Sequence, residues 1–266
     1  LLIASESKAF LAHPAFEKRL NEAALADWLS IEYLPGTETM FAGVYELPPA
    51  HTLTWKDGKL TIERYESLRF APCHGRGLRA WAGEIGTALA ESAAAHSIAD
   101  VEVGCFLSGG VDSSLVAREM ARRQPAVQCF SVGYAEAVYS ELPAARAAAA
   151  ALGVPLTETT VTAEDFFAAN RAIQWYLDEP MPNPAEIPLY FLCKTAAQQV
   201  KVVLSGEGAD ELFGGYPLYR QGAYMQMWQA VPPALRRVLA ARWPGCGFLR
   251  RGALARWQRC ARANYV

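Results

Sequence analysis

The first place in the sequence where chemistry can be read is a glycine-rich segment that carries one carboxylate and three hydroxyls. It reads Ser108-Gly109-Gly110-Val111-Asp112-Ser113-Ser114 and follows an apolar run at 101–107. Glycines allow a sharp turn that brings backbone N–H groups close to a ligand, and the start of a helix adds partial positive charge. These features predict a loop for phosphate or pyrophosphate. The alternative is a plain glycine turn with Asp112 or Ser113 as a helix cap.

The carboxylate of Asp112 narrows the kind of phosphate site. The segment lacks the lysine of a Walker A loop, so it is not that motif. A carboxylate and a phosphate repel each other unless a divalent cation lies between them. We therefore expect Asp112 to be a Mg²⁺ ligand.

A second small-residue segment carries three carboxylates. It reads Ser205-Gly206-Glu207-Gly208-Ala209-Asp210-Glu211-Leu212-Phe213-Gly214-Gly215-Tyr216 and begins with the last two residues of the run 201–206. If both apolar runs are parallel neighbouring strands, Asp112 and Asp210 can share one Mg²⁺. Glu207 would then lie nearer a substrate carboxylate that reacts at this site. The alternative is that Asp210 and Glu211 only stabilise the first turn of a helix, a role that we assign to Glu211.

Strands and helices alternate in the part of the chain that holds both segments. We expect strands at 101–107, 127–134, 154–161 and 201–206, and helices at 78–97, 113–123, 140–152, 163–177 and 188–199. Apolar strands that alternate with helices predict an α/β fold with a doubly wound parallel sheet, covered by helices on both faces. Ligands bind such sheets at the carboxyl ends of the strands, which is where both segments lie.

The N-terminal part has a different pattern. We expect helical structure over 5–34 and a β-meander before residue 70, with Asp57-Gly58 as a tight hairpin turn. A linker containing Pro and Gly at 70–77 predicts a domain boundary. The expected domains are therefore 1–70, 71–225 and a helical continuation over 226–266.

Composition excludes several classes of function. The 266 residues hold 25 Lys plus Arg and 27 Asp plus Glu, so the net charge of −2 does not favour nucleic-acid binding. No apolar stretch approaches the roughly 20 residues of a membrane span. The six cysteines form no CxxC pair, and we expect free thiols in the cytoplasm.

Several segments resemble a known family when they are taken together. The segment 108–114 resembles the pyrophosphate loop of the ATP pyrophosphatase (PP-loop) superfamily, and SGEGADELFGGY at 205–216 resembles the second signature of its glutamine-hydrolysing asparagine synthetase branch. LLIASESKAFLAHP at 1–14, GVYELPPAHTL at 43–53, LDEP at 177–180 and 185–206 are similar to that branch in the same order. The resemblance extends from residue 1 to about residue 220.

The resemblance implies an enzyme of two domains. An adenine nucleotide alpha hydrolase-like synthetase domain would follow the β-rich end of an N-terminal-nucleophile glutaminase domain. ATP with Mg²⁺ would adenylate the side-chain carboxylate of aspartate, and ammonia from glutamine would displace AMP. The implied partners are small molecules, with neither nucleic acid nor membrane, and a homodimer is left open.

The family's site residues carry over to matching positions of this chain. The resemblance implies that Ser108, Gly109, Gly110, Val111, Asp112, Ser113 and Ser114 hold pyrophosphate, that Leu107 and Val132 line the adenine site, and that Ser205, Gly206 and Glu207 border the nucleotide. Asp112 and Asp210 would be the metal ligands, and Glu207, Asp112 and Asp210 the catalytic residues.

Two departures leave alternatives open. Residue 1 is Leu and the first cysteine is Cys73, so we expect a fragment without the glutaminase nucleophile. Where the family commonly has Asp-Pro-Ser, this chain has Asn183-Pro184-Ala185-Glu186. The acceptor could therefore be another carboxylate, in an amidation or a ring closure. A nucleotide-binding module without turnover is the third hypothesis.

Overall fold

The structure is a computed structural model, and the description covers residues 1–180, 183–216, 219, 230–232 and 235. The chain divides into two compact units. The first comprises residues 1–72, 174–182 and 225–266, and the second comprises residues 73–173 and 183–224. The helical continuation predicted for 226–266 lies almost entirely outside the described residues.

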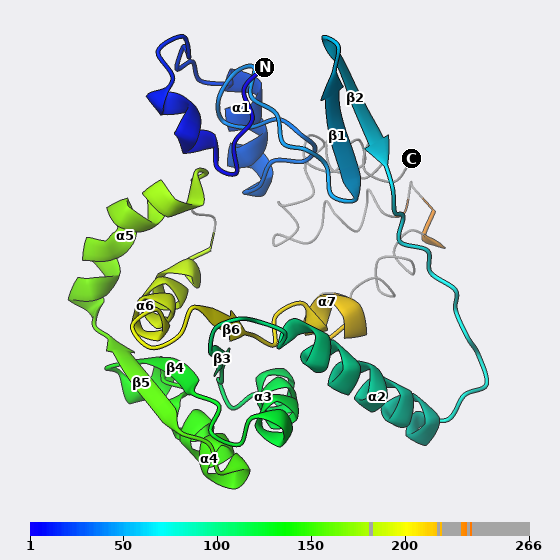
Figure 1. Ribbon diagram of the computed structural model, residues 1–266, viewed down its shortest axis with the longest axis vertical. Coiled ribbons are helices and arrows are strands. Elements are labelled where there is room, and N and C mark those ends of the chain that lie inside the picture. Colours follow the sequence, from blue (N-terminus) through cyan, green and yellow to red (C-terminus); the bar gives the residue numbers. More distant parts are fainter. Residues whose placement is uncertain (181–182, 217–218, 220–229, 233–234, 236–266) are drawn as a thin grey trace. The chain divides into compact units, whose positions relative to one another are not determined.

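The first unit contains short elements and one hairpin (Figure 1). A 3-10 helix, η1 (Ser7–Ala12), precedes α1 (Glu22–Ile31), whose N-cap is Asn21. The strands β1 (His51–Lys56) and β2 (Lys59–Arg64) pair antiparallel. Asp57 and Gly58 have φ angles of 50° and 75°, so the predicted hairpin turn is confirmed.

The predicted helix over 5–34 is wrong in its middle, where the chain is irregular between η1 and α1. Pro14 lacks the N–H that a continuing helix would need. Leu20 instead forms an antiparallel bridge with Phe41, and the side chain of Asn21 accepts a hydrogen bond from the N–H of Ala24. These contacts start a new helix rather than extend the first. The expected β-meander is reduced to the β1–β2 hairpin and two isolated bridges.

The second unit is built on a four-stranded parallel sheet with the order β5-β4-β3-β6. Its strands are β3 (Val103–Phe106), β4 (Cys129–Tyr134), β5 (Leu156–Val161) and β6 (Val202–Leu204). The register pairs Cys105 with both Cys129 and Leu204. The predicted parallel α/β sheet is confirmed, and β6 neighbours β3 at the edge of the described sheet.

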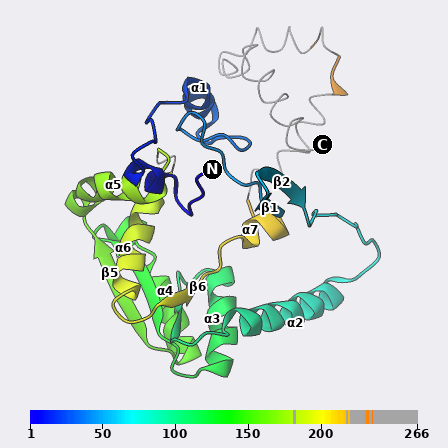
Figure 2. The ribbon, with the colours of Figure 1, turned by 45° about the horizontal axis from the view of Figure 1, so that its top comes forward.

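Helices cover both faces of this sheet (Figure 2). The helices of this unit are α2 (Leu78–His96), α3 (Val111–Arg123), α4 (Leu142–Leu152), most of α5 (Ala163–Leu177), α6 (Glu186–Ala196) and α7 (Ala209–Phe213), with a short η2 (Ala137–Tyr139). Side chains of α3 and α4 pack on one face, and those of α6 pack on the other. This is the doubly wound arrangement that the alternating pattern predicts.

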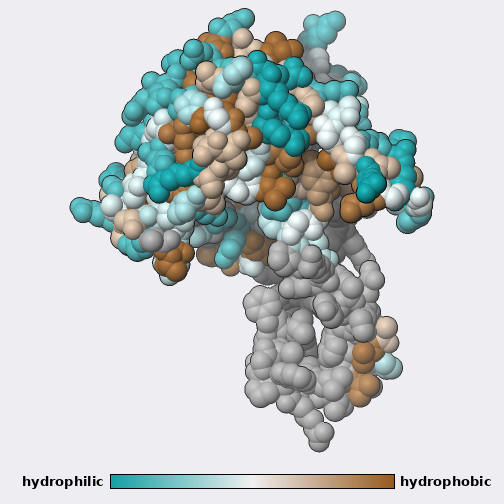
Figure 3. All heavy atoms as spheres, turned by 90° about the horizontal axis from the view of Figure 1, so that it is seen from below, coloured by the Kyte–Doolittle hydropathy of each residue, from teal (hydrophilic) through white to brown (hydrophobic). Residues whose placement is uncertain are grey.

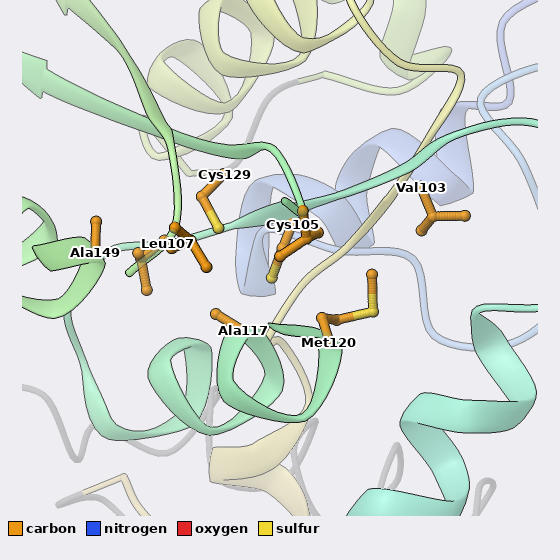
Figure 4. Packing of buried hydrophobic residues seen from close by; sticks show 9 residues of the cluster. Val103, Cys105, Leu107, Ala117, Met120, Cys129 and Ala149 are labelled. Atoms are coloured by element: carbon orange, nitrogen blue, oxygen red, sulfur yellow. The ribbon is translucent and has the colours of Figure 1, made fainter. Parts of the chain in front are cut away.

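The main core lies between β3, β4 and the helices α3 and α4 (Figure 4). Cys105 and Cys129 face Ala117 and Met120, and all four side chains are at most 2% exposed. Burial of apolar side chains holds the first turn of α3 near the end of β3, because the core fixes both elements. A hydrogen bond with the thiol of Cys129, together with burial, raises the pKa of Cys105, so its thiol stays protonated.

On the face in Figure 3, hydrophobic residues form separate patches between hydrophilic ones. Within the described part of the chain, no helix is both long enough and apolar enough to span a bilayer.

Candidate functional site

A cavity of about 520 Å³ lies in the second unit, where β3, β4 and β6 end. Both segments singled out in the sequence contribute to its wall. The predicted site residues that line it are Leu107, Ser108, Gly110, Asp112, Ser113, Val132, Ser205, Gly206, Glu207 and Asp210. The volume falls within the range of about 300–1,000 Å³ typical of small-molecule sites.

The hydroxyl of Ser113 organises the loop after β3. Its Oγ atom accepts a hydrogen bond from the N–H of Ser108 at 3.2 Å and lies 2.9 Å from the Oγ atom of Ser108. It also donates to the carbonyl of Gly110 at 3.3 Å. The side chain of Ser113 thus folds the loop back on the first turn of α3, where backbone N–H groups remain for a ligand.

Three predicted residues of this loop do not line the cavity: Gly109, Val111 and Ser114. Gly109 has φ 84°, and a Cβ atom there would lie 2.7 Å from the backbone nitrogen of Ala145. Its role in the structure is a left-handed turn packed against α4. Val111 is 75% exposed at the start of α3. The prediction that these three residues bind pyrophosphate stays a prediction.

The two loops meet at Gly206. A Cβ atom on Gly206 would lie 2.7 Å from the backbone nitrogen of Ser113 and 2.9 Å from the carbonyl carbon of Asp112. No other residue type allows this approach without a shift of backbone, since the atoms in the way are themselves backbone. The sequence expectation that the segments lie together at one edge of the sheet is confirmed.

Asp210 is held by the glycines that follow α7. The N–H of Gly215 donates to the carbonyl of Asp210 at 3.0 Å, and the absence of a Cβ on Gly215 leaves room for the carboxylate of Asp210. Nearby, the hydroxyl of Tyr216 donates to Oε1 of Glu211 at 2.7 Å. This hydrogen bond, with burial, raises the pKa of Tyr216 to about 12, so its hydroxyl remains a donor at neutral pH.

The cavity wall is acidic. Its carboxylates are those of Asp112, Glu141, Glu186, Glu207, Asp210 and Glu211, and no Lys, Arg or His is among the described lining residues. An anionic ligand would be repelled here unless divalent cations neutralised it, and oxygen ligands suit Mg²⁺. The carboxylates of Asp112 and Asp210 both line this cavity, and their role as Mg²⁺ ligands stays a prediction. Among the described residues, no group of three or more metal-ligating side chains forms a ready-made metal cage.

Other lining residues went unnoticed or unassigned in the sequence. Ser131 on β4 and Glu141 before α4 carry polar groups, while Phe106, Phe130, Leu189 and Leu192 supply apolar wall. Asn183, Ala185 and Glu186 of the segment that departs from the family pattern also line the cavity. Only Asn183, Ala185 and Glu186 had a signal in the sequence, which was their departure from the family pattern. Ser131 had none, because a small hydroxyl residue within an apolar strand looks like part of the core.

A second cavity of about 710 Å³ shares the loop after β6 as a wall. Its other walls come from α2, α3 and α7, including Trp81, Ile85, Leu115 and Phe213. Asp112 and Glu207 border both cavities. The loop at 205–209 therefore separates an acidic cavity from a mainly apolar one.

The fold and site together define a parallel α/β protein with two acidic, glycine-rich loops at the carboxyl ends of adjacent strands. Residues 84–265 match the family model for asparagine synthase, and residues 1–66 match that for a glutamine amidotransferase domain. The chain belongs to the asparagine synthase family.

Relatives with curated names agree with this assignment. The chain is 39% identical over 242 residues to a Mycobacterium bovis protein provisionally named asparagine synthetase [glutamine-hydrolyzing], and the match covers 88% of this chain and 37% of that protein. It is 35% identical over 237 residues to asparagine synthetase [glutamine-hydrolyzing] 1 of Bacillus subtilis, covering 89% and 37%. The chain thus spans little more than a third of the length of these two relatives.

Among solved structures, the glutamine-dependent NAD+ synthetase of Acinetobacter baumannii is 20% identical with a TM-score of 0.38, covering 59% of this chain and 32% of that chain. The family assignment rests on the sequence matches.

Proposed function

We propose that this chain provides the ATP-using part of a glutamine-dependent, AMP-forming amidotransferase whose acceptor is aspartate. The observation that carries the proposal is the contact of Gly206 with the backbone of Asp112 and Ser113. That contact brings a phosphate-type loop and an acidic loop to the wall of one cavity. Membership of the asparagine synthase family supports the reaction class.

ATP would bind with its phosphates at the loop after β3. The residues Ser108 to Ser114 would supply N–H and O–H donors, and Leu107 and Val132 would border the adenine. Asp112 and Asp210 would hold Mg²⁺, which when bound neutralises charge on the phosphates. Ser205, Gly206 and Glu207 would border the nucleotide from the other side.

The reaction needs no covalent bond to the enzyme. An oxygen of the aspartate side-chain carboxylate attacks the α-phosphorus, the bond to the bridging oxygen breaks, and pyrophosphate leaves. Ammonia then attacks the acyl carbon, loses a proton, and AMP leaves with the electron pair of the broken C–O bond. Donors from the loop after β3 stabilise the charge on pyrophosphate, and Glu207 faces the reacting groups.

Glutamine would supply the ammonia, in keeping with the glutamine amidotransferase match of residues 1–66. The proposal includes a cytoplasmic enzyme of amino-acid biosynthesis that acts on small molecules. A homodimer is compatible with it.

A second candidate function is amidation or ring closure on another carboxylate. The observation that favours it is the presence of Asn183 and Glu186 on the cavity wall. A neutral amide and an extra carboxylate at these positions change which charged groups of an acceptor are tolerated.

The proposal is tested by a screen for pyrophosphate release with the protein in which this chain occurs. Carboxylic acids are supplied one at a time with Mg-ATP, and with either ammonia or glutamine. Release that depends on aspartate supports asparagine synthesis, and release with a different acid alone supports the second candidate. ATP binding without release for any acid contradicts both and leaves a nucleotide-binding module.

The variant Asp112→Asn tests the metal role within the same assay. The change keeps the shape of the side chain and removes its charge, so the fold should persist. We expect Mg²⁺-dependent pyrophosphate release to disappear. Release at the wild-type rate would contradict the assignment of Asp112 as a metal ligand.

A further inference from the structure

Ser131 combines burial with a missing hydrogen bond. Four polar or charged residues in the described part of the chain are buried: Thr39, Ser113, Glu119 and Ser131. The side chains of the first three hydrogen-bond to protein groups. Ser131 is 2% exposed, and no described residue hydrogen-bonds to its hydroxyl. A buried hydroxyl without a partner is rare in proteins and calls for an explanation.

The position of Ser131 suggests what that explanation is. Ser131 lines the acidic cavity beside Val132. Successive side chains of a strand point to opposite faces of the sheet. Cys129 packs on the side of α3, whereas Phe130 packs on the side of α6, so Ser131 faces the side of α3.

The register of the sheet places Ser131 near the loop after β3. The N–H of Leu107 donates to the carbonyl of Phe130 at 2.9 Å, so Ser131 lies level with the end of β3. Ser108, the first residue of the phosphate-type loop, follows directly. Ser131 lines the same cavity as Ser108, Gly110 and Ser113 of that loop.

We propose that the hydroxyl of Ser131 donates a hydrogen bond to the phosphate chain of the bound nucleotide. The inference rests on the proposed function, since it assigns one more contact within the same cavity. It assigns Ser131 to the phosphates rather than to the adenine, which is expected near Leu107 and Val132. In this view the strand carries a polar group in its core for binding rather than for folding.

The energetics separate this role from a structural one. Removing a buried, unpaired hydroxyl from the free protein leaves its stability unchanged or raises it, because no hydrogen bond is lost. Removing the same hydroxyl from the nucleotide complex leaves a phosphate oxygen without a donor. Ser131→Ala should therefore weaken binding without weakening the fold.

The experiment measures the affinity of the wild-type protein and of Ser131→Ala for three probes: Mg-ATP, Mg-pyrophosphate and adenosine. We expect the affinity for Mg-ATP and Mg-pyrophosphate to fall about 5- to 10-fold, the value of one ordinary hydrogen bond, and the affinity for adenosine to stay unchanged. Urea unfolding without ligand should give a midpoint equal to or above that of the wild type.

The matched control is Ser97→Ala at the end of α2. The hydroxyl of Ser97 donates to the carbonyl of Ala93, so the control should lower stability and leave the affinity for pyrophosphate unchanged. An unchanged affinity of Ser131→Ala for Mg-pyrophosphate would overturn the inference. An equal loss for adenosine, or a lower unfolding midpoint of Ser131→Ala, would overturn it as well.

The two proposals can fail separately. If the wild-type protein binds Mg-ATP but Ser131→Ala binds it equally well, only the role of Ser131 is lost. If the wild-type protein binds neither Mg-ATP nor Mg-pyrophosphate, the proposed function and the role of Ser131 are both overturned.

Discussion

The ammonium nitrogen of Lys8 lies 2.7 Å from Oδ1 of Asp178, although 170 positions separate the two residues in the sequence. The N–H of Lys8 also donates to Oδ2 of Asp178 at 3.3 Å, and Glu6 lies 2.9 Å from the same ammonium. The side chains of Lys8 and Asp178 are mostly buried, at 13% and 14% exposure. The pair joins the start of the chain to the residues after α5 within the first unit.

Removing the charge of Lys8 should destabilise the first unit more than removing the charge of Asp178. Lys8→Met leaves a carboxylate mostly buried without its main partner, whereas Asp178→Asn keeps an acceptor for the N–H of Lys8. Asn also tolerates the φ of 62° at this position. Urea unfolding should give a lower midpoint for Lys8→Met, and the double variant should be no worse than Lys8→Met alone.

The same pair predicts a dependence on pH. The hydrogen bond to Asp178 raises the pKa of Lys8 above its ordinary value of 10.5. The stabilisation is therefore complete below pH 10.5 and is lost as the pH rises through the higher folded value. If the losses of stability in Lys8→Met and Asp178→Asn simply add up in the double variant, the result would contradict an interaction between the two side chains.

A methyl group at Gly206 should separate the two loops of the site. The Cβ of Gly206→Ala meets backbone atoms of Asp112 and Ser113, which cannot rotate away as a side chain could. A displacement of about 1 Å between reacting groups costs roughly 100-fold in rate, so pyrophosphate release should fall by about that factor. The unfolding midpoint and the nucleotide affinity, measured in parallel, distinguish a small displacement of the loop from a loss of its fold.

The matched control is Gly86→Ala in α2, where a Cβ meets nothing within 4 Å. Alanine in a helix is favoured over glycine by about 1 kcal/mol, so this control should be more stable and equally active. Full activity of Gly206→Ala would show that the close approach of the loops is not needed.

The parallel sheet was predictable because β3, β4 and β6 are mostly apolar runs that alternate with helices. The placement of the two loops followed from the same pattern, since the carboxyl ends of parallel strands lie at one edge. The sequence could not reveal that α6 begins at Glu186 rather than 188. Pro188 suggested a later start, but Pro is tolerated in a first turn, where its missing N–H has no intrahelical partner.

The parts of the site that escaped prediction depend on contacts between distant residues. The sequence did not indicate that Gly109 packs against the backbone of Ala144 and Ala145 in α4, and its predicted role in pyrophosphate binding stays a prediction. Ser131 and Glu141 line the cavity because of the register of β4 and the position at which α4 begins. No local pattern encodes such neighbours, because they are set by tertiary packing.

The carboxylate of Glu119 should contribute stability that acid removes. Burial alone would raise its pKa, but hydrogen bonds from Arg118 and Arg122 at 2.7 and 3.1 Å outweigh it and lower the pKa below 4.5. The stabilisation is present above pH 4.5 and is lost as the pH falls through the lower folded value. Glu119→Gln should cost about 1–3 kcal/mol at neutral pH and flatten the acid side of the stability curve. Glu91→Gln, at an exposed position of α2, is the control, and an unchanged curve for Glu119→Gln would count against this account.

Glu207 should matter for turnover more than for nucleotide binding. It borders the acidic cavity on the loop that contacts Asp112, and Glu207→Gln keeps its size while removing its charge. If Glu207 orients or deprotonates a reacting group, pyrophosphate release should fall about 100-fold or more, while the affinity for Mg-ATP changes less than about 2-fold. Glu102→Gln is the control, because Glu102 precedes β3 at the opposite end of the strand and should keep full activity. Unchanged turnover of Glu207→Gln would remove this residue from the catalytic set, whereas a loss confined to Mg-ATP affinity would make it a binding residue only.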